Sequence, residues 1–380
     1  METLCPNKEV CGSCGWSHIP YEKQLQQKLS DINGSFALKE LDITCDTILP
    51  SPQTAHYRDR MDFVINFQGL VGMRQKGKWW RVVDGNHCFL ADEKIENHFA
   101  SVRTWVGESG LSFFDRKSHI GLLRYAVIRS TSLGETMINI VTSAPLGPDE
   151  EKEAREQLEQ LAAIAQPTTL LWSINSTVSD VSFGDDIHVL SGPGYIEEEV
   201  NGTRYRITPN AFFQTNLYGA PILQQTVIEA CGDVSGKTVL DLYCGSGFFA
   251  NALAAHAEKT IGVELVPEAI RDAKVNAELN GLDLGTQIEF YDAKTEYFEW
   301  KELGADVVIL DPPRSGMHDK ALADVIDAAP EHVVYVSCNY KHFAREMVQL
   351  QNLYTIENMV AIDMFPHTPH VELVTSLRKK

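Results

Sequence analysis

The 380-residue chain lacks any apolar run approaching the ~18 residues that a membrane-spanning helix needs. Its first residues, Met-Glu-Thr-Leu-Cys, have neither the basic start nor the apolar stretch of a secretory signal. Internal repeats and low-complexity linkers are also missing from the sequence. These absences exclude a membrane-embedded or fibrous protein. They predict a cytoplasmic globular chain, long enough for two domains, with no membrane partner.

Basic residues are scarce as well. Lys and Arg number 33 against 52 Asp and Glu, which gives a formal net charge of −19. A polyanionic partner usually requires a basic surface, so the overall charge argues against a simple nucleic-acid binder. Locally the balance reverses, and the basic residues concerned are Arg58, Arg60, Arg74, Lys76, Lys78, Arg81, Arg116, Lys117, Arg124 and Arg129. Two interpretations stay open: a basic face on an acidic protein, or an ordinary solvated charged surface.

The pattern of apolar residues changes near residue 208. From residue 57 to 208 alternating runs predict strands, with an Asn-Gly hairpin at 201–202 and an acidic helix at 148–165. After residue 208 strands and helices alternate, which is typical of a doubly wound parallel sheet. An earlier helix is predicted from Leu25 and Leu29, ending at Asn33-Gly34. We therefore expect a mainly antiparallel α+β domain at 1–207 and an α/β domain at 208–380, with residues 22–50 able to pack on the latter.

Acidic residues recur at the expected strand ends of the second domain. The strand at 238–243 runs into a single Gly-x-Gly, not the full dinucleotide fingerprint, so a pyrophosphate is disfavoured. The acidic positions at successive strand ends are Asp241, Glu264, Asp292 and Asp311. Such a rim suits S-adenosylmethionine, whose sulfonium is cationic. The alternative is that these carboxylates only cap helices and turns.

Cys338 follows a buried-strand pattern at 332–337, which places its thiol at the same rim. A lone cysteine is often a small buried apolar residue. A thiolate at such a rim could, however, add to C6 of uracil and make C5 nucleophilic enough to attack a methyl donor. A base must then remove the C5 proton, and Glu372 is the candidate; the alternative is a surface carboxylate on the last strand.

Five motifs occur in order along the C-terminal half: Phe-Phe-Gln-Thr-Asn at 212–216, the glycine turn at 241–247, Asp-Pro-Pro-Arg at 311–314, Ser-Cys-Asn at 337–339 and Pro-His-Thr-Pro-His-Val-Glu at 366–372. Together they resemble the RNA uracil-5 methyltransferase family. The resemblance implies a Rossmann-like methyltransferase domain with Cys338 as nucleophile and Glu372 as proton-abstracting base. It implies cofactor contacts from Gln214, Tyr243, Glu264 and Asp311. After Asn339 the match departs, because Tyr340 stands where many members have proline.

The resemblance extends to the N-terminal half. Cys5, Cys11, Cys14 and Cys88 look like the four ligands of an iron–sulfur cluster found in several members, here read as [4Fe–4S] with a structural or RNA-shaping role. Spacing alone would also permit a zinc site, since both use the Cys-x-x-Cys pair at 11 and 14. The chain begins almost at these cysteines, as in the shorter ribosomal RNA enzymes of the family.

The implied partner is a structured RNA, 23S ribosomal RNA before transfer RNA, and a monomer without obligate protein partners is expected. Bases must be flipped from the stack, for which Phe212, Phe213 and Tyr243 are candidate contacts. An amino-group methyltransferase is disfavoured because Arg314 replaces the aromatic residue of its motif. A cytosine-5 enzyme is disfavoured because no cysteine follows Pro313. A non-catalytic RNA-binding or RNA-folding protein with this fold remains the alternative from another class.

Overall fold

The computed structural model describes residues 5, 7, 9–85 and 87–380. Its internal contacts divide the chain into two compact units. The first comprises residues 1–18, 53–198 and 207–210, and the second comprises residues 19–52, 199–206 and 211–380. The segment 19–52 therefore belongs to the C-terminal unit although it precedes most of the first unit in sequence.

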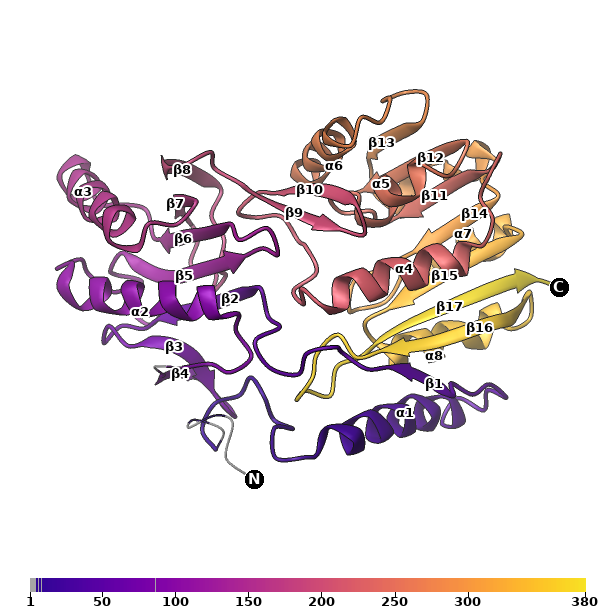
Figure 1. Cartoon of the computed structure of the whole chain (residues 1–380), viewed down its shortest axis with the longest axis horizontal. Coiled ribbons are helices and arrows are strands. Elements are labelled where there is room, and N and C mark those ends of the chain that lie inside the picture. Colours follow the sequence, from indigo (N-terminus) through magenta and orange to yellow (C-terminus); the bar gives the residue numbers. More distant parts are fainter. Residues whose placement is uncertain (1–4, 6, 8, 86) are drawn as a thin grey trace. The chain divides into compact units, whose positions relative to one another are not determined.

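The second unit is built on an eight-stranded sheet in the order β1-β16-β17-β15-β14-β11-β12-β13 (Figure 1). Strands β15, β14, β11, β12 and β13 are parallel neighbours, whereas β17 runs antiparallel to both β15 and β16. The strands are β1 (Thr47–Leu49), β11 (Thr238–Leu242), β12 (Lys259–Glu264), β13 (Ile288–Asp292), β14 (Val307–Leu310), β15 (His332–Ser337), β16 (Tyr354–Ile362) and β17 (Glu372–Lys379). This confirms the Rossmann-like sheet and the closing antiparallel pair.

Helices cover both faces of this sheet. They are α1 (Tyr21–Ala37), α4 (Gly219–Cys231), α5 (Phe248–Ala254), α6 (Pro267–Leu279), α7 (Asp319–Ala328) and α8 (Tyr340–Leu350), with short 3-10 helices η1 (Thr295–Tyr297) and η2 (Trp300–Leu303). One apolar core joins α1, α7 and α8 to the sheet. Within it the rings of Phe36 and Phe343 pack edge to face, with 5.9 Å between their centroids. A second core lies between α5, α6 and β13. Burial of these apolar faces holds the parallel strands in register.

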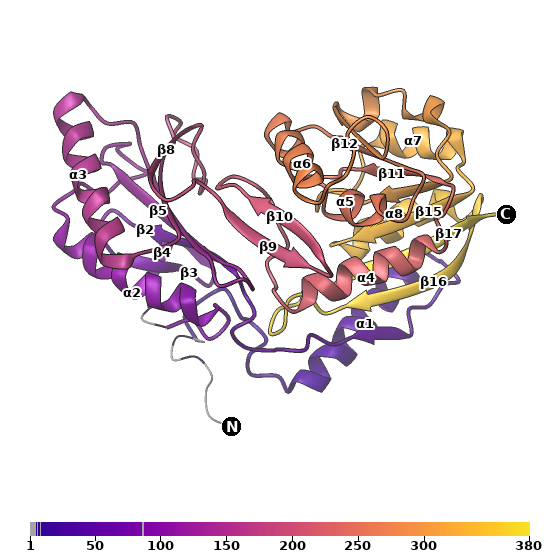
Figure 2. The same cartoon turned by 45° about the horizontal axis from the view of Figure 1, so that its top comes forward.

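The first unit is a seven-stranded sheet in the order β4-β3-β2-β5-β6-β7-β8. Its elements are β2 (Arg60–Ile65), β3 (Val71–Gln75), β4 (Lys78–Asp84), α2 (Glu93–Glu108), β5 (Leu123–Ser130), β6 (Thr136–Thr142), α3 (Pro148–Ala165), β7 (Thr169–Ile174) and β8 (Asp186–Ser191). Helices α2 and α3 pack against this sheet and share one apolar core with it (Figure 2). The sheet is antiparallel except between β6 and β7, because α3 returns the chain for a parallel crossover.

The predicted Asn-Gly hairpin is present. Strands β9 (Ile196–Val200) and β10 (Thr203–Ile207) pair through Asn201 and Gly202, which both have positive φ. Two central residues in the left-handed region fit the tight turn that such hairpins favour. Helix α2 was not predicted, although its buried Ile95, Phe99 and Val102 follow helical spacing.

Helix α1 forms where the spacing of Leu25 and Leu29 predicts it, but its buried face is different. The most buried positions of its first turns are Gln24 and Lys28, with exposed fractions of 0% and 1%. Lys28 Nζ lies 2.5 Å from Asp363 Oδ1, and both side chains are fully buried. Burial lowers the pKa of Lys28, and Asp363 opposes that shift. Apolar periodicity could not show this, because a distant carboxylate makes the lysine tolerable inside.

Replacing Lys28 by Ala leaves Asp363 buried without its cationic partner. The free energy of unfolding of the second unit should fall by about 3–5 kcal/mol, as is usual when one member of a buried pair is removed. Calorimetry or urea unfolding measures this loss. Lys23→Ala, at an exposed position of the same helix, should change stability by less than about 0.5 kcal/mol. Equal effects of the two substitutions would contradict the importance of the pair.

Candidate active site

The nucleophile and base expected from the sequence are brought together by strand register. Cys338 directly follows β15, and Glu372 is the first residue of β17. These two strands are antiparallel, with Ser337 opposite Leu373. One further step along each strand places Cys338 opposite Glu372. The sheet therefore fixes the backbones of the thiol and the carboxylate as close neighbours.

The electrostatics of this pair favour the neutral forms. Burial raises the pKa of the Cys338 thiol to about 12, with further contributions from Glu372 and Asp311, while Arg314 opposes the shift. Burial, then Asp311, raises the pKa of Glu372 well above its usual value, and Arg314 again opposes. A thiol and a carboxyl with unfavourable ionisation are poised to respond to a cationic ligand.

Asp311 and Arg314 stand on the loop after β14. Burial raises the pKa of Asp311 to about 7. The loop is tied at two points: Asn339 Nδ2 donates to the Arg314 carbonyl at 3.0 Å, and Met317 N donates to Glu346 Oε1 at 3.0 Å. Asn339 also caps α8 by accepting from Lys341 N. Tyr340 is simply the first residue of that helix, so the departure from the family motif is accommodated there.

The glycine turn after β11 lies beside the end of β12. Tyr243 and Gly247 both have positive φ, and a Cβ on Gly247 would lie 2.3 Å from Asn251 Nδ2. The left-handed backbone, together with this contact, disfavours a side chain at Gly247. Asp241 is less accessible than expected, although burial and the charges of Asp311 and Glu264 together raise its pKa. It is fully buried and accepts a hydrogen bond from Ala250 N at the start of α5, which is the capping role.

Glu264 and Asp292 do end neighbouring strands, paired in register as Glu264 and Asp292 of β12 and β13. Glu264 Oε2 accepts from Gly245 N at 3.2 Å, and its Oε1 accepts from Val266 N at 2.9 Å. These bonds orient the carboxylate beside the glycine turn. Asp292 is exposed. The two residues leave acidic oxygens at the carboxyl ends of parallel strands, where open α/β sheets bind ligands.

Gln214 lies between β10 and α4 and is largely buried. Of its aromatic neighbours, Phe212 is 70% exposed, whereas Phe213 is buried against Tyr205 and Phe248. Phe212 is thus available to a ligand and Phe213 belongs to the core. Asn216, which the sequence did not single out, is fully buried and accepts from Tyr218 N and Gly219 N.

The four cysteines expected to bind a cluster line one cavity of the first unit. Burial, then the neighbouring Cys5, Cys11 and Cys88, raise the pKa of Cys14 to about 12. The remaining wall is largely apolar, with Phe63, Met73, Val83 and Phe99. Within the described part of the chain, however, no three His, Cys, Asp or Glu side chains are grouped so that they could hold a metal ion.

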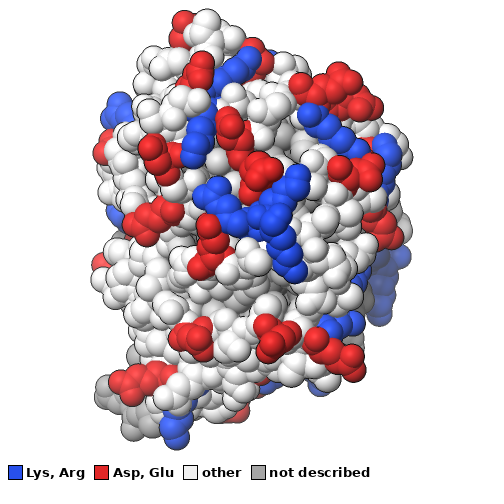
Figure 3. All heavy atoms as spheres, turned by 90° about the vertical axis from the view of Figure 1, so that its right-hand side faces the viewer, with Lys and Arg blue, Asp and Glu red and all other residues white. Residues whose placement is uncertain are grey.

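The basic residues counted in the sequence are mostly engaged with protein groups. Arg60 pairs with Asp62 at 2.8 Å, and Arg74 and Arg116 both reach Asp180. The others with buried positions are Arg124 and Arg129. Figure 3 draws a different face, on the side where Figure 1 shows β17 and the C-terminus; there Lys and Arg gather near the middle with Asp and Glu around them. That face is mixed in charge.

No helix in the described ranges is long and apolar enough to cross a membrane. Residues 182–380 match the model of the tRNA (uracil-5-)-methyltransferase family. A tRNA (uracil(54)-C(5))-methyltransferase of Pyrococcus furiosus is 38% identical over 97% of this chain and 83% of its own. The chain belongs to the RNA uracil-5 methyltransferase family. This methyltransferase is also 39% identical to an uncharacterised RNA methyltransferase of Caldanaerobacter subterraneus, over 100% of this chain and 85% of the relative.

A solved structure supports the same assignment. The Pyrococcus abyssi tRNA (uracil-54, C5)-methyltransferase, in complex with S-adenosyl-L-homocysteine, is 34% identical with a TM-score of 0.80, covering 96% of this chain and 85% of that one. The methyltransferase is therefore an S-adenosylmethionine-dependent RNA (uracil-C5)-methyltransferase.

Proposed function

We propose that this methyltransferase modifies C5 of one uridine in a structured RNA through a covalent bond between Cys338 and C6. The observation that carries the proposal is the register of β15 and β17, which sets the Cys338 thiol opposite the Glu372 carboxylate. One group adds to the pyrimidine and the other removes its proton. Both reacting groups come from strand termini, where the backbone is held by sheet hydrogen bonds.

The two residues act in sequence. When the cationic cofactor is bound, Cys338 and Glu372 ionise and their two protons pass to solvent. The Cys338 thiolate then forms a bond to C6, and the electron pair of the C5–C6 double bond moves towards C5 and the C4 carbonyl. Bound S-adenosylmethionine supplies the electrophilic methyl group and leaves as S-adenosylhomocysteine. Glu372 then accepts the C5 proton, the C6–S bond breaks, and the thiolate is regenerated with the 5,6 double bond restored.

The resting state of the site explains why Arg314 matters. In the free protein the raised pKa keeps Cys338 as a thiol, and Arg314 is the cation that opposes this shift. Arg314 opposes the raised pKa of Glu372 in the same way. When the cofactor binds, the positive charge of its sulfonium should lower the pKa of Cys338 and Glu372 further, as Arg314 does. Thiolate formation is thereby coupled to cofactor binding.

Cys338→Ala should abolish methylation, with turnover at least about 1000-fold lower, because the covalent step is lost. Glu372→Gln should lower turnover by about 100- to 10000-fold. It should also accumulate a covalent protein–RNA adduct, because methyl transfer precedes proton removal. Denaturing gels with unmodified tRNA transcripts and a 23S rRNA transcript measure the adduct and identify the RNA that carries it.

Two matched variants control for disturbance of the fold. Cys45→Ala removes another buried thiol of the same unit, and Glu357→Gln removes a carboxylate of the neighbouring β16. Both should retain methylation and trap nothing. A Cys338→Ala protein that methylates RNA as well as the parent would disprove the mechanism. An RNA-bound but catalytically silent parent would favour the RNA-folding alternative.

We propose that the cofactor contacts Gln214, Tyr243, Glu264 and Asp311, the positions that the family resemblance implies. Glu264, oriented by Gly245 N and Val266 N, offers carboxylate oxygens to ribose hydroxyls. Tyr243 occupies the turn beside it, and Gln214 flanks α4. Asp311 supplies negative charge for the sulfonium.

The affinity for S-adenosylmethionine should rise as the pH increases from 6 to 8, because Asp311, with a pKa of about 7, becomes ionised. Up to about a tenfold change per pH unit is expected below that pKa. S-adenosylhomocysteine, which lacks the sulfonium charge, should show a smaller change. Calorimetric titrations of both ligands measure the difference.

Asp311→Asn should flatten the pH dependence, whereas Asp292→Asn at the exposed end of β13 should preserve it. Asp241 and Glu372 are also titratable, and the charge of Asp311 raises the pKa of both. A residual slope in Asp311→Asn would report these two groups. An unchanged slope would show that Asp311 does not face the cation.

Among RNAs, tRNA is the substrate that the named relatives favour. Both the Pyrococcus furiosus relative and the Pyrococcus abyssi structure are named for uracil 54 of tRNA. The motif resemblance to the short ribosomal RNA enzymes keeps 23S rRNA as the second candidate. The adduct gels described above separate the two, because only the true substrate should be trapped by Glu372→Gln.

We propose that the cysteines lining the cavity of the first unit bind an iron–sulfur cluster, because thiolates are its usual ligands, although no three possible metal ligands among the described residues are grouped around a metal position. Four thiols line the cavity, and apolar walls protect such clusters from solvent. Cys5, Cys11, Cys14 and Cys88 would hold the cluster, which would join the N-terminal segment to the loop before α2. Its contribution there is structural.

Protein purified without oxygen should contain about four iron and four sulfide per chain and absorb broadly in the visible range. Cys14→Ser should lose both iron and colour, since its thiol is one of the four donors. Cys45→Ser, outside the cavity, should keep them. Stoichiometric zinc without sulfide would instead establish the Cys₄ zinc alternative.

A further inference from the structure

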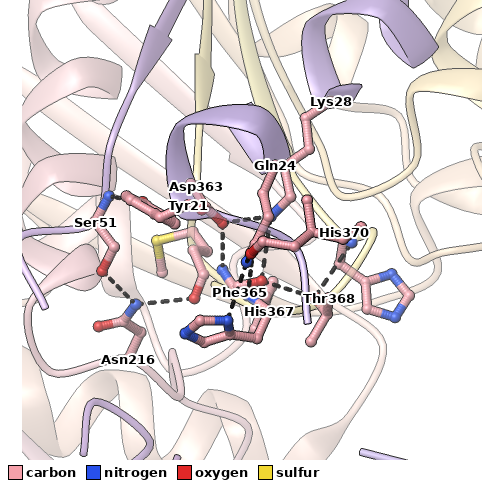
Figure 4. A network of polar contacts seen from close by, with 12 residues as sticks. Tyr21, Gln24, Lys28, Ser51, Asn216, Asp363, Phe365, His367, Thr368 and His370 are labelled. Carbon is pink, nitrogen blue, oxygen red and sulfur yellow. Dashed lines mark hydrogen bonds and ion pairs between the residues drawn. The ribbon is translucent and has the colours of Figure 1, made fainter. Parts of the chain in front are cut away.

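The connection between β16 and β17 leads directly into Glu372 and is held by buried polar side chains from distant segments (Figure 4). Residues 363–371 contain no regular secondary structure. Strand pairing closes the connection, with Ile362 opposite Glu372. Its course between these ends is therefore determined by side-chain anchors and not by a hydrogen-bonded ladder.

Lys28 of α1 provides the first anchor. Its Nζ contacts Asp363 Oδ1 at 2.5 Å and the Phe365 carbonyl at 3.1 Å. The same carboxylate oxygen accepts from Phe365 N at 3.1 Å, and Thr368 Oγ1 donates to the Phe365 carbonyl at 2.7 Å. One fully buried lysine thus organises three residues of the connection.

Gln24, one helical turn earlier, provides the second anchor. Its Oε1 accepts from His367 N at 2.7 Å, and its Nε2 donates to His367 Nδ1 at 3.0 Å. Because the amide nitrogen can only donate, Nδ1 must be the unprotonated ring nitrogen. His367 has φ of 66°, a left-handed conformation that is strained for a residue with a side chain. The two bonds from Gln24 hold this strained residue in place.

Asn216, two residues after the proposed cofactor contact Gln214, also belongs to this network. Its Nδ2 donates to the Met364 carbonyl at 2.8 Å and to Ser51 Oγ at 3.3 Å. Ser51 N in turn donates to the Tyr21 hydroxyl at 2.8 Å. Asn216 lies two residues after Gln214, so one buried network spans the segment assigned to the cofactor and the segment that precedes the base.

We infer that Gln24 and Lys28 are positioning residues for the methylation reaction, which fix the 363–371 connection and thereby the reach of Glu372 towards the C5 proton. This inference rests on the proposed roles of Cys338 and Glu372. It adds a function for helix α1, which precedes the methyltransferase sheet in sequence but packs within the same unit.

A purely stabilising role would not require this chemistry. Apolar side chains of similar volume often stabilise a buried site as well as an ion pair does. Polar anchors differ in that they satisfy only one arrangement of the backbone groups they bind. Here they bind Phe365, Met364 and His367, all within the connection that ends at the base.

The test uses Gln24→Met, which keeps the side-chain volume and removes both bonds to His367. Transcripts of tRNA and of 23S rRNA carrying tritium at C5 of uracil report elimination as tritium release. Radioactive methyl groups report transfer. Elimination should slow by about 10- to 100-fold, because a small misplacement of a catalytic group is costly. Methyl transfer and S-adenosylmethionine affinity should stay within about twofold, so the methylated adduct accumulates.

Gln27→Met on the exposed face of the same helix is the matched control and should behave as the parent. Gln24→Glu is nearly isosteric, accepts from His367 N and should restore part of the elimination rate. It also keeps the test available should Gln24→Met fail to fold. If either Gln24 variant slows transfer and elimination equally, or if Gln24→Met matches Gln27→Met, the positioning role is disproved.

Glu372→Gln is measured in parallel to separate the positioning role of Gln24 from the proposed role of Glu372 as base. If it traps the adduct while Gln24→Met does not, the positioning role falls and the proposed function stands. If Glu372→Gln releases tritium as fast as the parent, the assignment of the base fails, and the positioning role fails with it.

Discussion

The site depends on one strand running against its neighbours. Had β17 been parallel to β15, Glu372 would lie at the opposite edge of the sheet from Cys338. Because it is antiparallel, the first residue of β17 meets the first residue after β15. Asp311, Tyr243 and Glu264 follow or end the parallel strands β14, β11 and β12 at their carboxyl ends, where open α/β sheets bind ligands. A sequence that keeps the five parallel strands but loses this reversal would no longer bring Cys338 and Glu372 together.

Burial of acidic groups follows from this arrangement and sets the electrostatic character of the site. Asp241, Asp311 and Glu372 all have raised pKa values, with burial as the main cause and mutual repulsion adding to it for Asp241 and Glu372. A cation relieves such a cluster more than a neutral ligand does. A cluster of this kind favours a sulfonium over a phosphate, and Arg314 offsets only part of the raised pKa of Glu372.

Local sequence patterns were sufficient for the alternation of strands and helices after residue 208, for the hairpin at Asn201-Gly202 and for the chain order of the motifs. They were insufficient wherever a partner lies far away in sequence. Lys28 appears as an ordinary surface lysine until Asp363 is placed beside it. Asp241 appears as an accessible rim carboxylate until its full burial and the hydrogen bond from Ala250 N to its Oδ2 are seen. The parallel pairing of β6 and β7 likewise depends on how α3 returns the chain, which strand periodicity does not encode.

The buried network around Asp363 shows why these long-range partners matter. Lys28 and Asp363 are both removed from water, which is expensive for each charge, and an apolar pair could fill the same space at least as stably. What an apolar pair could not do is discriminate between alternative paths of an irregular connection, since it binds no backbone groups. The network binds the backbone of Phe365, Met364 and His367, and it holds the last of these in a strained conformation. The network thus gives the chain a single course immediately before Glu372. In the proposed mechanism the position of this carboxylate decides how fast the C5 proton is removed and the RNA product is released.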